Sequence, residues 1–209
     1  MATVKKKPSA KKKKKPAPKT QSARKAAPAK TTPARKVHPV VVAPATPPPI
    51  PFDIAPHFAR VREAVGQLVA KLKRKGAPVK LGDQASVEAI LAAERVRGIF
   101  LPNDYRALLS LHDGMSVLDR RFFATRDYRE DTSLTQAARG FLQTAAERGV
   151  AGIEACIPLA QWGRPNDWLL YDPLGKVHGG KPGYVVMLDA QAHPMKDLCD
   201  ALASLEKLA

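Results

Sequence analysis

Metal-binding or nucleophilic chemistry in this chain would depend on two cysteines and five histidines. Cys156 and Cys199 lack the Cys-x-x-Cys spacing of a metal or redox site. No HxH or HExxH pattern occurs among the histidines, which are His38, His57, His112, His178 and His193. Asp189, His178 and His193 could bind one metal ion together only if the fold happened to bring them close. We therefore predict buried thiols, no metal site and no catalytic residue.

Two loops have compositions that suit an ion. Residues 175–183, GKVHGGKPG, are glycine-rich, as in a phosphate-binding loop. The GxxxxGK[ST] pattern is incomplete because Pro182 follows the lysine, and the segment connects two predicted strands rather than a strand and a helix. Asp127, Glu130 and Asp131 offer carboxylates to a divalent cation, but without an EF-hand pattern. We predict a connecting loop in the first case and no cofactor in either.

The first 50 residues hold most of the net charge. They contain 12 Lys, 2 Arg and no acidic residue, whereas the rest of the chain has 21 basic and 19 acidic residues. Such a segment can lie along a polyanion and release its counterions, which predicts salt-sensitive, nonspecific nucleic-acid binding. The alternative is a solubilising extension without a dedicated ligand. The cations are Lys5, Lys6, Lys7, Lys11, Lys12, Lys13, Lys14, Lys15, Lys19, Arg24, Lys25, Lys30, Arg35 and Lys36.

The composition of this segment also predicts disorder. It has ten of the chain's nineteen prolines and no aromatic residue, so it cannot bury enough apolar surface to offset its ordering entropy. Its Lys, Ala and Pro content resembles the tails of linker-histone-like proteins. We predict a disordered basic tail over residues 1–36, a proline-rich linker over 37–56 with extended backbone, and one folded domain over 57–209.

The cellular compartment is predicted from the targeting signals that residues 1–50 have or lack. The apolar stretch 37–50 is interrupted by five prolines, which argues against a secretory signal. A mitochondrial or plastid transit peptide stays open, and the lysine run 11–15 fits nuclear localisation in a eukaryote. No stretch has the length of a membrane span. We expect a soluble cytoplasmic protein without a membrane partner, associated with the nucleoid if the chain is bacterial.

Periodicity and end signals predict the elements that position these residues. Apolar residues at helical spacing indicate five helices, over 57–75, 86–97, 102–113, 133–148 and 196–208. Apolar runs indicate four strands, over 117–124, 153–159, 168–171 and 184–188. Residues 126–131 are predicted to be a charged loop, and Gly114 is predicted to close the third of these helices. Helices at both ends of a set of strands predict an α+β fold.

A resemblance to a known family begins in the third predicted helix. Residues 101–114 read L-P-x-D-Y-x-x-L-L-x-x-H-D-G, and this run resembles the helical signature of the SMI1/KNR4 (SUKH) superfamily, with Asp-Gly in place of the usual Asn-Gly. The resemblance extends more weakly to the C-terminus and covers residues 57–209. It implies a SUKH-like domain with a mixed or antiparallel sheet packed against helices. The matching residues are Leu101, Pro102, Asp104, Tyr105, Leu108, Leu109 and Gly114.

The same resemblance implies a binding function, because the superfamily spans fungal cell-wall regulators and bacterial immunity proteins that neutralise toxins. We therefore expect a non-catalytic, protein-binding domain that the basic tail tethers to nucleic acid. One alternative is an immunity protein for a cognate toxin, such as a nuclease, with an incidental tail. Another is an enzyme whose site the sequence does not reveal. Trp162 and Trp168 are either core residues or a partner-binding surface, where Trp is over-represented.

Overall fold

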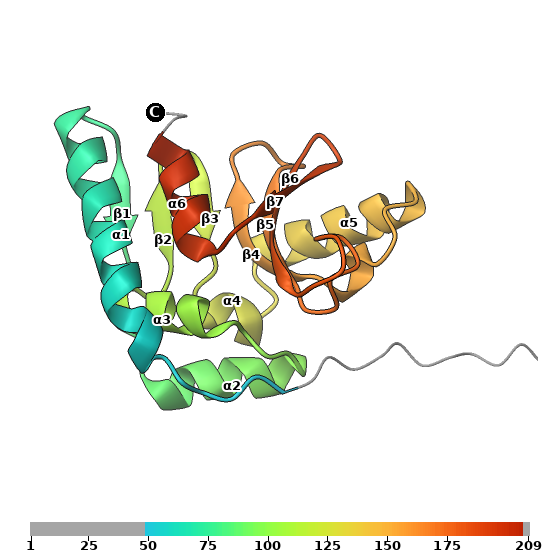
Figure 1. The fold of residues 1–209 in the computed structure, drawn as a ribbon, viewed down its shortest axis with the longest axis horizontal. Helices are drawn as coiled ribbons and strands as arrows, with labels where there is room; N and C mark the ends of the chain where they lie inside the picture. Colours follow the sequence, from blue (N-terminus) through green and yellow to red (C-terminus); the bar gives the residue numbers. More distant parts are fainter. Residues whose placement is uncertain (1–48, 207–209) are drawn as a thin grey trace, which may run out of the picture. The chain divides into compact units, whose positions relative to one another are not determined.

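The computed structural model describes residues 49–206 (Figure 1). The predicted disorder of residues 1–36, the transit-peptide alternative and most of the predicted linker lie outside this range. Within it, no helix combines the length and the apolar character needed to cross a bilayer. The predicted α+β fold is confirmed, with helices packed against one antiparallel sheet.

The sheet has seven strands over the described residues, and each strand pairs antiparallel with the next one along the chain. This simple order follows from short connections, because consecutive antiparallel strands need only a tight turn between them. The exceptions are the β1–β2 and β3–β4 connections, which carry helices, and the β5–β6 connection, which is a longer loop over residues 173–182. The strands are β1 (Val79–Leu81), β2 (Met115–Val117), β3 (Arg120–Phe122), β4 (Ile157–Trp162), β5 (Trp168–Asp172), β6 (Gly183–Leu188) and β7 (Gln191–Met195).

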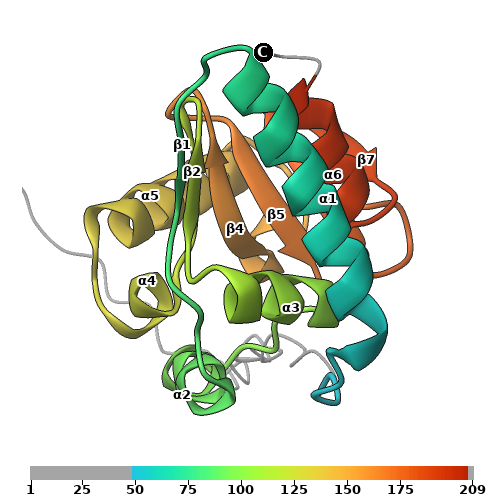
Figure 2. The ribbon, with the colours of Figure 1, turned by 90° about the vertical axis from the view of Figure 1, so that its left-hand side faces the viewer.

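Helices cover both faces of this sheet. Figures 1 and 2 show α1 and α6 side by side on one face and α5 on the other. Helix α3 packs against α1, and α2 packs against α4 at one end of the sheet. The helices are α1 (Ala55–Arg74), α2 (Val87–Arg97), α3 (Asn103–Leu111), α4 (Thr125–Arg129), α5 (Ser133–Glu147) and α6 (Leu198–Glu206), with a 3₁₀ turn, η1, at Ile153–Ala155.

The helices predicted from end signals are present where those signals stand. The Ser86 hydroxyl accepts a hydrogen bond of 3.2 Å from the backbone N–H of Ala89 and so begins α2. Gly98 ends the same helix with φ of 63°, in the left-handed region that glycine adopts without strain. Helix α5 begins at Ser133 as predicted, and the Thr132 hydroxyl caps it by accepting a hydrogen bond of 3.3 Å from the backbone N–H of Thr135.

Other local predictions were wrong. The single strand expected over 117–124 is the β2–β3 hairpin, which turns at Leu118 with a positive φ of 57° and without a glycine to mark it. The charged loop expected at 126–131 begins as helix α4, and the strand expected at 153–159 begins as η1. Gly114 has a left-handed φ of 86°, but it turns the chain into β2 after α3 has already ended at Leu111.

Strands β1 and β7 were not predicted. Both lie at the edges of the sheet, and most of their residues are exposed, so neither has the alternation of apolar and polar residues that marks a half-buried strand. Pro194 within β7 also argues against a strand, although edge strands tolerate proline. Together with the five interior strands, β1 and β7 make up the seven-stranded sheet.

Candidate functional site

The residues of the family-like motif form the framework of the fold. The carboxylate of Asp104 accepts hydrogen bonds from the Tyr184 hydroxyl and from the backbone N–H of Leu198 at 3.3 Å, which ties α3 to β6 and α6. The Tyr105 hydroxyl lies 2.9 Å from the carbonyl oxygen of Phe123 and 2.7 Å from that of Leu159. Both motif residues are buried. The role of these residues in this structure is therefore structural.

Burial also raises the pKa values of the tyrosines in this framework. The pKa of Tyr184 lies well above its usual value because the side chain is desolvated and the Asp104 carboxylate is next to it. Desolvation likewise raises the pKa values of Tyr105 and Tyr128. These phenols stay protonated at neutral pH and donate hydrogen bonds within the framework.

An internal ion pair fixes the start of the domain. Arg106 Nε lies 2.8 Å from Glu94 Oε1, and its terminal nitrogen donates to the carbonyl oxygens of Ile50 at 3.1 Å and Pro51 at 2.9 Å. The guanidinium carbon stands 5.1 Å from the centre of the Phe52 ring. The linker predicted to reach residue 56 therefore ends earlier, since residues 50–52 already contact α3.

Neither tryptophan belongs to a partner-binding surface. Trp162 and Trp168 are 3% and 0% exposed, so the core interpretation is confirmed and the surface interpretation is wrong. The Trp168 ring stacks on Phe141 of α5, with ring centres 5.9 Å apart, and its indole N–H donates to the Pro165 carbonyl at 3.0 Å. These contacts anchor α5 to the sheet, which explains why a large aromatic residue is needed at the start of β5.

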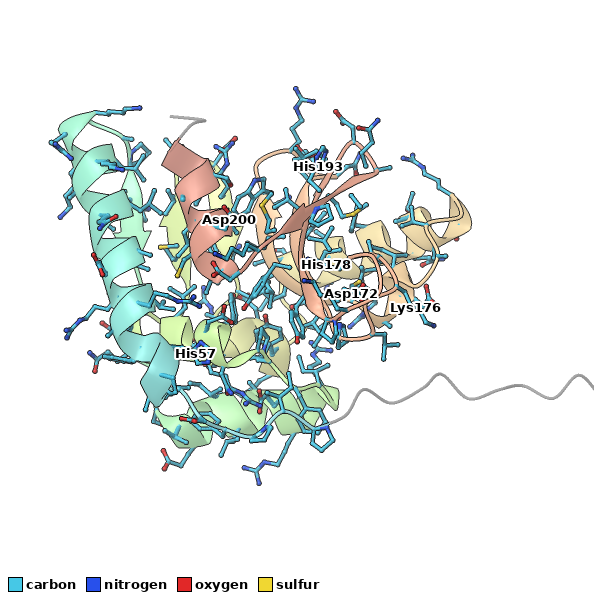
Figure 3. The ribbon with its side chains drawn as sticks, in the orientation of Figure 1. His57, Asp172, Lys176, His178, His193 and Asp200 are labelled. Atoms are coloured by element: carbon cyan, nitrogen blue, oxygen red, sulfur yellow. The ribbon has the colours of Figure 1, made fainter. Side chains whose placement is uncertain are left out.

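The structure describes both cysteines and four of the five histidines considered for metal or thiol chemistry, and His38 lies outside residues 49–206. Among residues 49–206, no cluster of three or more His, Cys, Asp or Glu side chains is arranged to hold a metal ion. Figure 3 shows His193 away from His178. Cys156 is buried and Cys199 is half-buried, both are free thiols, and desolvation raises both pKa values. Thiols held in the protonated form are poor nucleophiles.

The glycine-rich segment 175–183 is organised around a carboxylate rather than open to a phosphate. Asp172 is fully buried and accepts hydrogen bonds from the backbone N–H groups of Leu174 at 3.1 Å, Val177 at 2.6 Å and His178 at 2.9 Å. Figure 3 shows Asp172, at the end of β5, next to His178 of this segment. The backbone N–H groups of Val177 and His178 already bind Asp172, and the segment joins β5 to β6, so the prediction of a connecting loop is confirmed.

A hollow of about 440 Å³ lies where the β1 end of the sheet meets α4, and we call it the polar cleft. Four separate segments of the chain contribute to it, which are β1 with the following loop, the α3–β2 turn, β3, and the start of α4. Its polar residues carry both signs of charge. They are Lys80, Asp83, Gln84, Asp113, Ser116, Arg121, Arg126 and Asp127.

The floor of the polar cleft is built from tight backbone contacts. Asp113 accepts hydrogen bonds from the backbone N–H of Thr125 at 2.5 Å and from its hydroxyl at 2.7 Å, which fixes the start of α4. The N–H of Gly82 donates to the Gly114 carbonyl at 2.9 Å. A Cβ atom at Gly82 would lie 2.2 Å from the carbonyl oxygen of Asp113, so only glycine fits where these two backbones meet.

The buried carboxylate of Asp127 is also engaged by hydrogen bonds within the fold. Asp127 accepts from the backbone N–H of Ala124 at 2.9 Å and from the Thr132 hydroxyl at 2.8 Å, and Arg121 approaches it to 3.6 Å. The three carboxylates considered for a divalent cation, Asp127, Glu130 and Asp131, do not converge, because Asp127 is buried whereas the other two are exposed. What remains exposed at the cleft mouth is Lys80, Asp83, Gln84 and Arg126.

The sequence did not predict the polar cleft. Its residues lie in segments up to 47 positions apart, between Lys80 and Asp127, and none of them stands in a pattern that indicates a site. The only local signal was the Asp113–Gly114 pair of the motif, which marks a turn. The chain matches no known family model and no curated protein, so the SMI1/KNR4 resemblance depends on its motif alone.

Proposed function

We propose that this chain is a non-catalytic binding protein. In this proposal, residues 49–206 recognise a protein partner through the polar cleft, and the basic tail binds nucleic acid without sequence preference. The observation that supports the first half most directly is the division of charge in the cleft. Asp113 and Asp127 are engaged by hydrogen bonds of the fold, whereas exposed charges of both signs surround the mouth.

A protein surface is the partner that suits this arrangement. Lys80 and Arg126 can pair with acidic residues and Asp83 with a basic one, and such complementary pairs give specificity and speed association. The floor is held by hydrogen bonds of 2.5 to 2.9 Å around Asp113 and Gly82, so little conformational freedom is lost on binding. Catalysis would require an acid, base or nucleophile directed at a substrate, whereas the carboxylates of Asp113 and Asp127 already accept hydrogen bonds within the fold.

Nucleic-acid binding is proposed for the basic tail because of its charge. Fourteen cations and no acidic residue lie within residues 1–50, while the remainder of the chain is nearly neutral. Release of condensed counterions gives such a segment affinity for any phosphate backbone. The domain would then bind the specific protein partner, and the tail would hold the protein on nucleic acid.

The SMI1/KNR4 resemblance supports a narrower candidate for the partner, a toxin domain blocked by surface contact. If the chain is an immunity protein, the tail is incidental. Protection against the cognate toxin would then be the same for the natural chain and for a neutral-tail variant, in which all fourteen Lys and Arg of residues 1–36 are replaced by Gln.

Site-specific cross-linking in cells tests the proposed cleft. A photo-reactive phenylalanine analogue at Gln84 should cross-link one protein, and combining Lys80→Glu with Arg126→Glu should abolish that product. The matched control is the same analogue at Gln143, an exposed residue of α5 that does not line the cleft. Equal cross-linking from both positions, or a product that survives the charge reversals, would contradict recognition through the cleft.

A further inference from the structure

A second hollow, of about 370 Å³, lies between α1 and the neighbouring ends of β1 and α3, and we call it the α1 groove. Figure 2 shows α1 and β1 from the side on which both face the viewer. Val65, Val69 and Leu111 contribute apolar surface to the groove, and Leu81 from β1 is 40% exposed. An exposed leucine beside other apolar residues forms an apolar patch whose contact with water is unfavourable.

Gly66 of α1 lines this groove. It stands in the middle of a 20-residue helix, where glycine destabilises. A Cβ atom there would meet nothing within 4 Å, in contrast to Gly82, where backbone atoms exclude one. The fold therefore does not require glycine at position 66. Because position 66 has no side chain, another molecule has room to approach the α1 backbone closely.

The charge of the groove is of one sign. Arg62 and Lys73 are exposed on α1 and both line the groove, and eleven residues of helix separate them, a distance of about 16 Å. No acidic residue is among the described residues that line it. A ligand that covers the apolar surface would therefore present negative charge near both ends, at a spacing of about three helical turns.

These features select one class of occupant. Nucleic acid would satisfy the cations but has no aliphatic side chains to cover Val69 and Leu81. The basic tail of this chain has the wrong charge, since residues 1–50 contain no Asp or Glu. An amphipathic segment of a protein partner, with aliphatic residues on one face and acidic residues beside them, matches both the apolar surface and the charge.

We infer that the α1 groove docks an acidic, aliphatic segment of a protein partner, with its backbone closest to Gly66. This inference rests on the proposed protein-binding function and extends it to a second surface. Leu81 lines both the groove and the polar cleft, so the two surfaces adjoin at β1. A partner that uses both would contact β1 from two sides.

Selection from a random library of 16-residue peptides on phage tests this inference. The bait is the full-length neutral-tail variant, so that acidic peptides are not enriched by the basic tail. Enriched peptides should combine Asp or Glu with Leu, Ile or Phe. In fluorescence anisotropy, Gly66→Leu should weaken their binding at least tenfold, and Arg62→Glu with Lys73→Glu should do the same.

The chain offers a matched control for each change. Gly140 is also a mid-helix glycine with nothing within 4 Å of its Cβ position, but it lies in α5 outside the groove, so Gly140→Leu should leave binding unchanged. Arg139→Glu with Arg148→Glu controls for lost positive charge. Circular dichroism should show that both leucine variants keep their helix content.

Three results would overturn the inference. If Gly66→Leu and Gly140→Leu have the same effect on peptide binding, the groove is not the docking surface. If binding is lost only with Lys80→Glu and Arg126→Glu, the groove inference fails while protein binding through the polar cleft stands. If the library yields no enriched sequence, both the groove inference and the protein-binding function are contradicted.

Discussion

Arg106 and Glu94 form an ion pair inside the domain, with side chains only 1% and 5% exposed and a shortest N–O distance of 2.8 Å. The pair joins α3 to α2, and through Ile50 and Pro51 it also fixes the entry of the chain into the domain. A charge buried in this way is tolerated only because its partner and further hydrogen bonds satisfy it.

Removing one member of this pair should therefore destabilise the domain strongly. Arg106→Met leaves the Glu94 carboxylate buried without its counter-charge, and we expect a loss of about 3–5 kcal/mol in the free energy of unfolding. Urea denaturation followed by circular dichroism measures it. Arg139→Met is the matched control, because its pair with Asp131 is 60% and 56% exposed and should contribute less than about 1 kcal/mol. Similar losses in the two variants would contradict the structural role of Arg106.

High pH should destabilise the domain through its buried tyrosines. Burial raises the pKa of Tyr184 in the folded state, whereas the unfolded chain has the ordinary pKa of about 10. Above that pH the unfolded state loses the phenolic proton and the folded state keeps it, so the free energy of unfolding falls as pH rises. The slope is up to about 1.4 kcal/mol per pH unit for each such tyrosine.

Denaturant titrations between pH 8 and pH 11 check this dependence. Tyr184→Phe removes one titrating group and should reduce the slope above pH 10, at a cost in stability at neutral pH because Asp104 loses a hydrogen-bond donor. An unchanged slope in this variant would show that Tyr184 does not titrate with a raised pKa.

Three glycines should respond differently to alanine. Gly66→Ala and Gly140→Ala place a methyl group in open space within helices, so each should stabilise the domain by up to about 1 kcal/mol. Gly82→Ala should destabilise it, because the methyl group would overlap the Asp113 carbonyl oxygen. Thermal unfolding of the three variants measures the differences. Stabilisation by Gly82→Ala would contradict the close backbone contact at the polar cleft.

The two thiols should react slowly and at different rates. Desolvation raises the pKa values of both Cys156 and Cys199, so little thiolate is present at pH 8. Cys156 is the more buried of the two and should react with Ellman's reagent only on unfolding, while Cys199 should react first. Fast modification of both thiols in the folded protein would contradict this assignment, and Cys199→Ser identifies which thiol is responsible.

The sequence predicted the elements whose signals are local. Ser86 and Gly98 mark the two ends of α2, and the apolar runs of β5 and β6 are long enough to indicate buried strands. Leu118 gave no turn signal because leucine seldom adopts positive φ, so the β2–β3 hairpin was missed.

The candidate sites were less predictable, because their geometry depends on long-range contacts. Asp104 has the sequence context of a helix start, yet its partners Tyr184 and Leu198 lie 80 and 94 residues away. The polar cleft likewise joins segments that have no common pattern. Composition alone could identify the basic tail, because charge does not require a fold.

The central claim is that the tail binds nucleic acid and the domain binds a protein partner. It is tested most directly by fluorescence anisotropy of a labelled 30-base-pair DNA duplex across a salt titration, comparing the natural chain with the neutral-tail variant. The natural chain should bind with an affinity that falls steeply with salt, with a log–log slope no steeper than about −12, and the neutral-tail variant should not bind. Equal binding by the two proteins, or no binding by either at physiological salt, would contradict the claim.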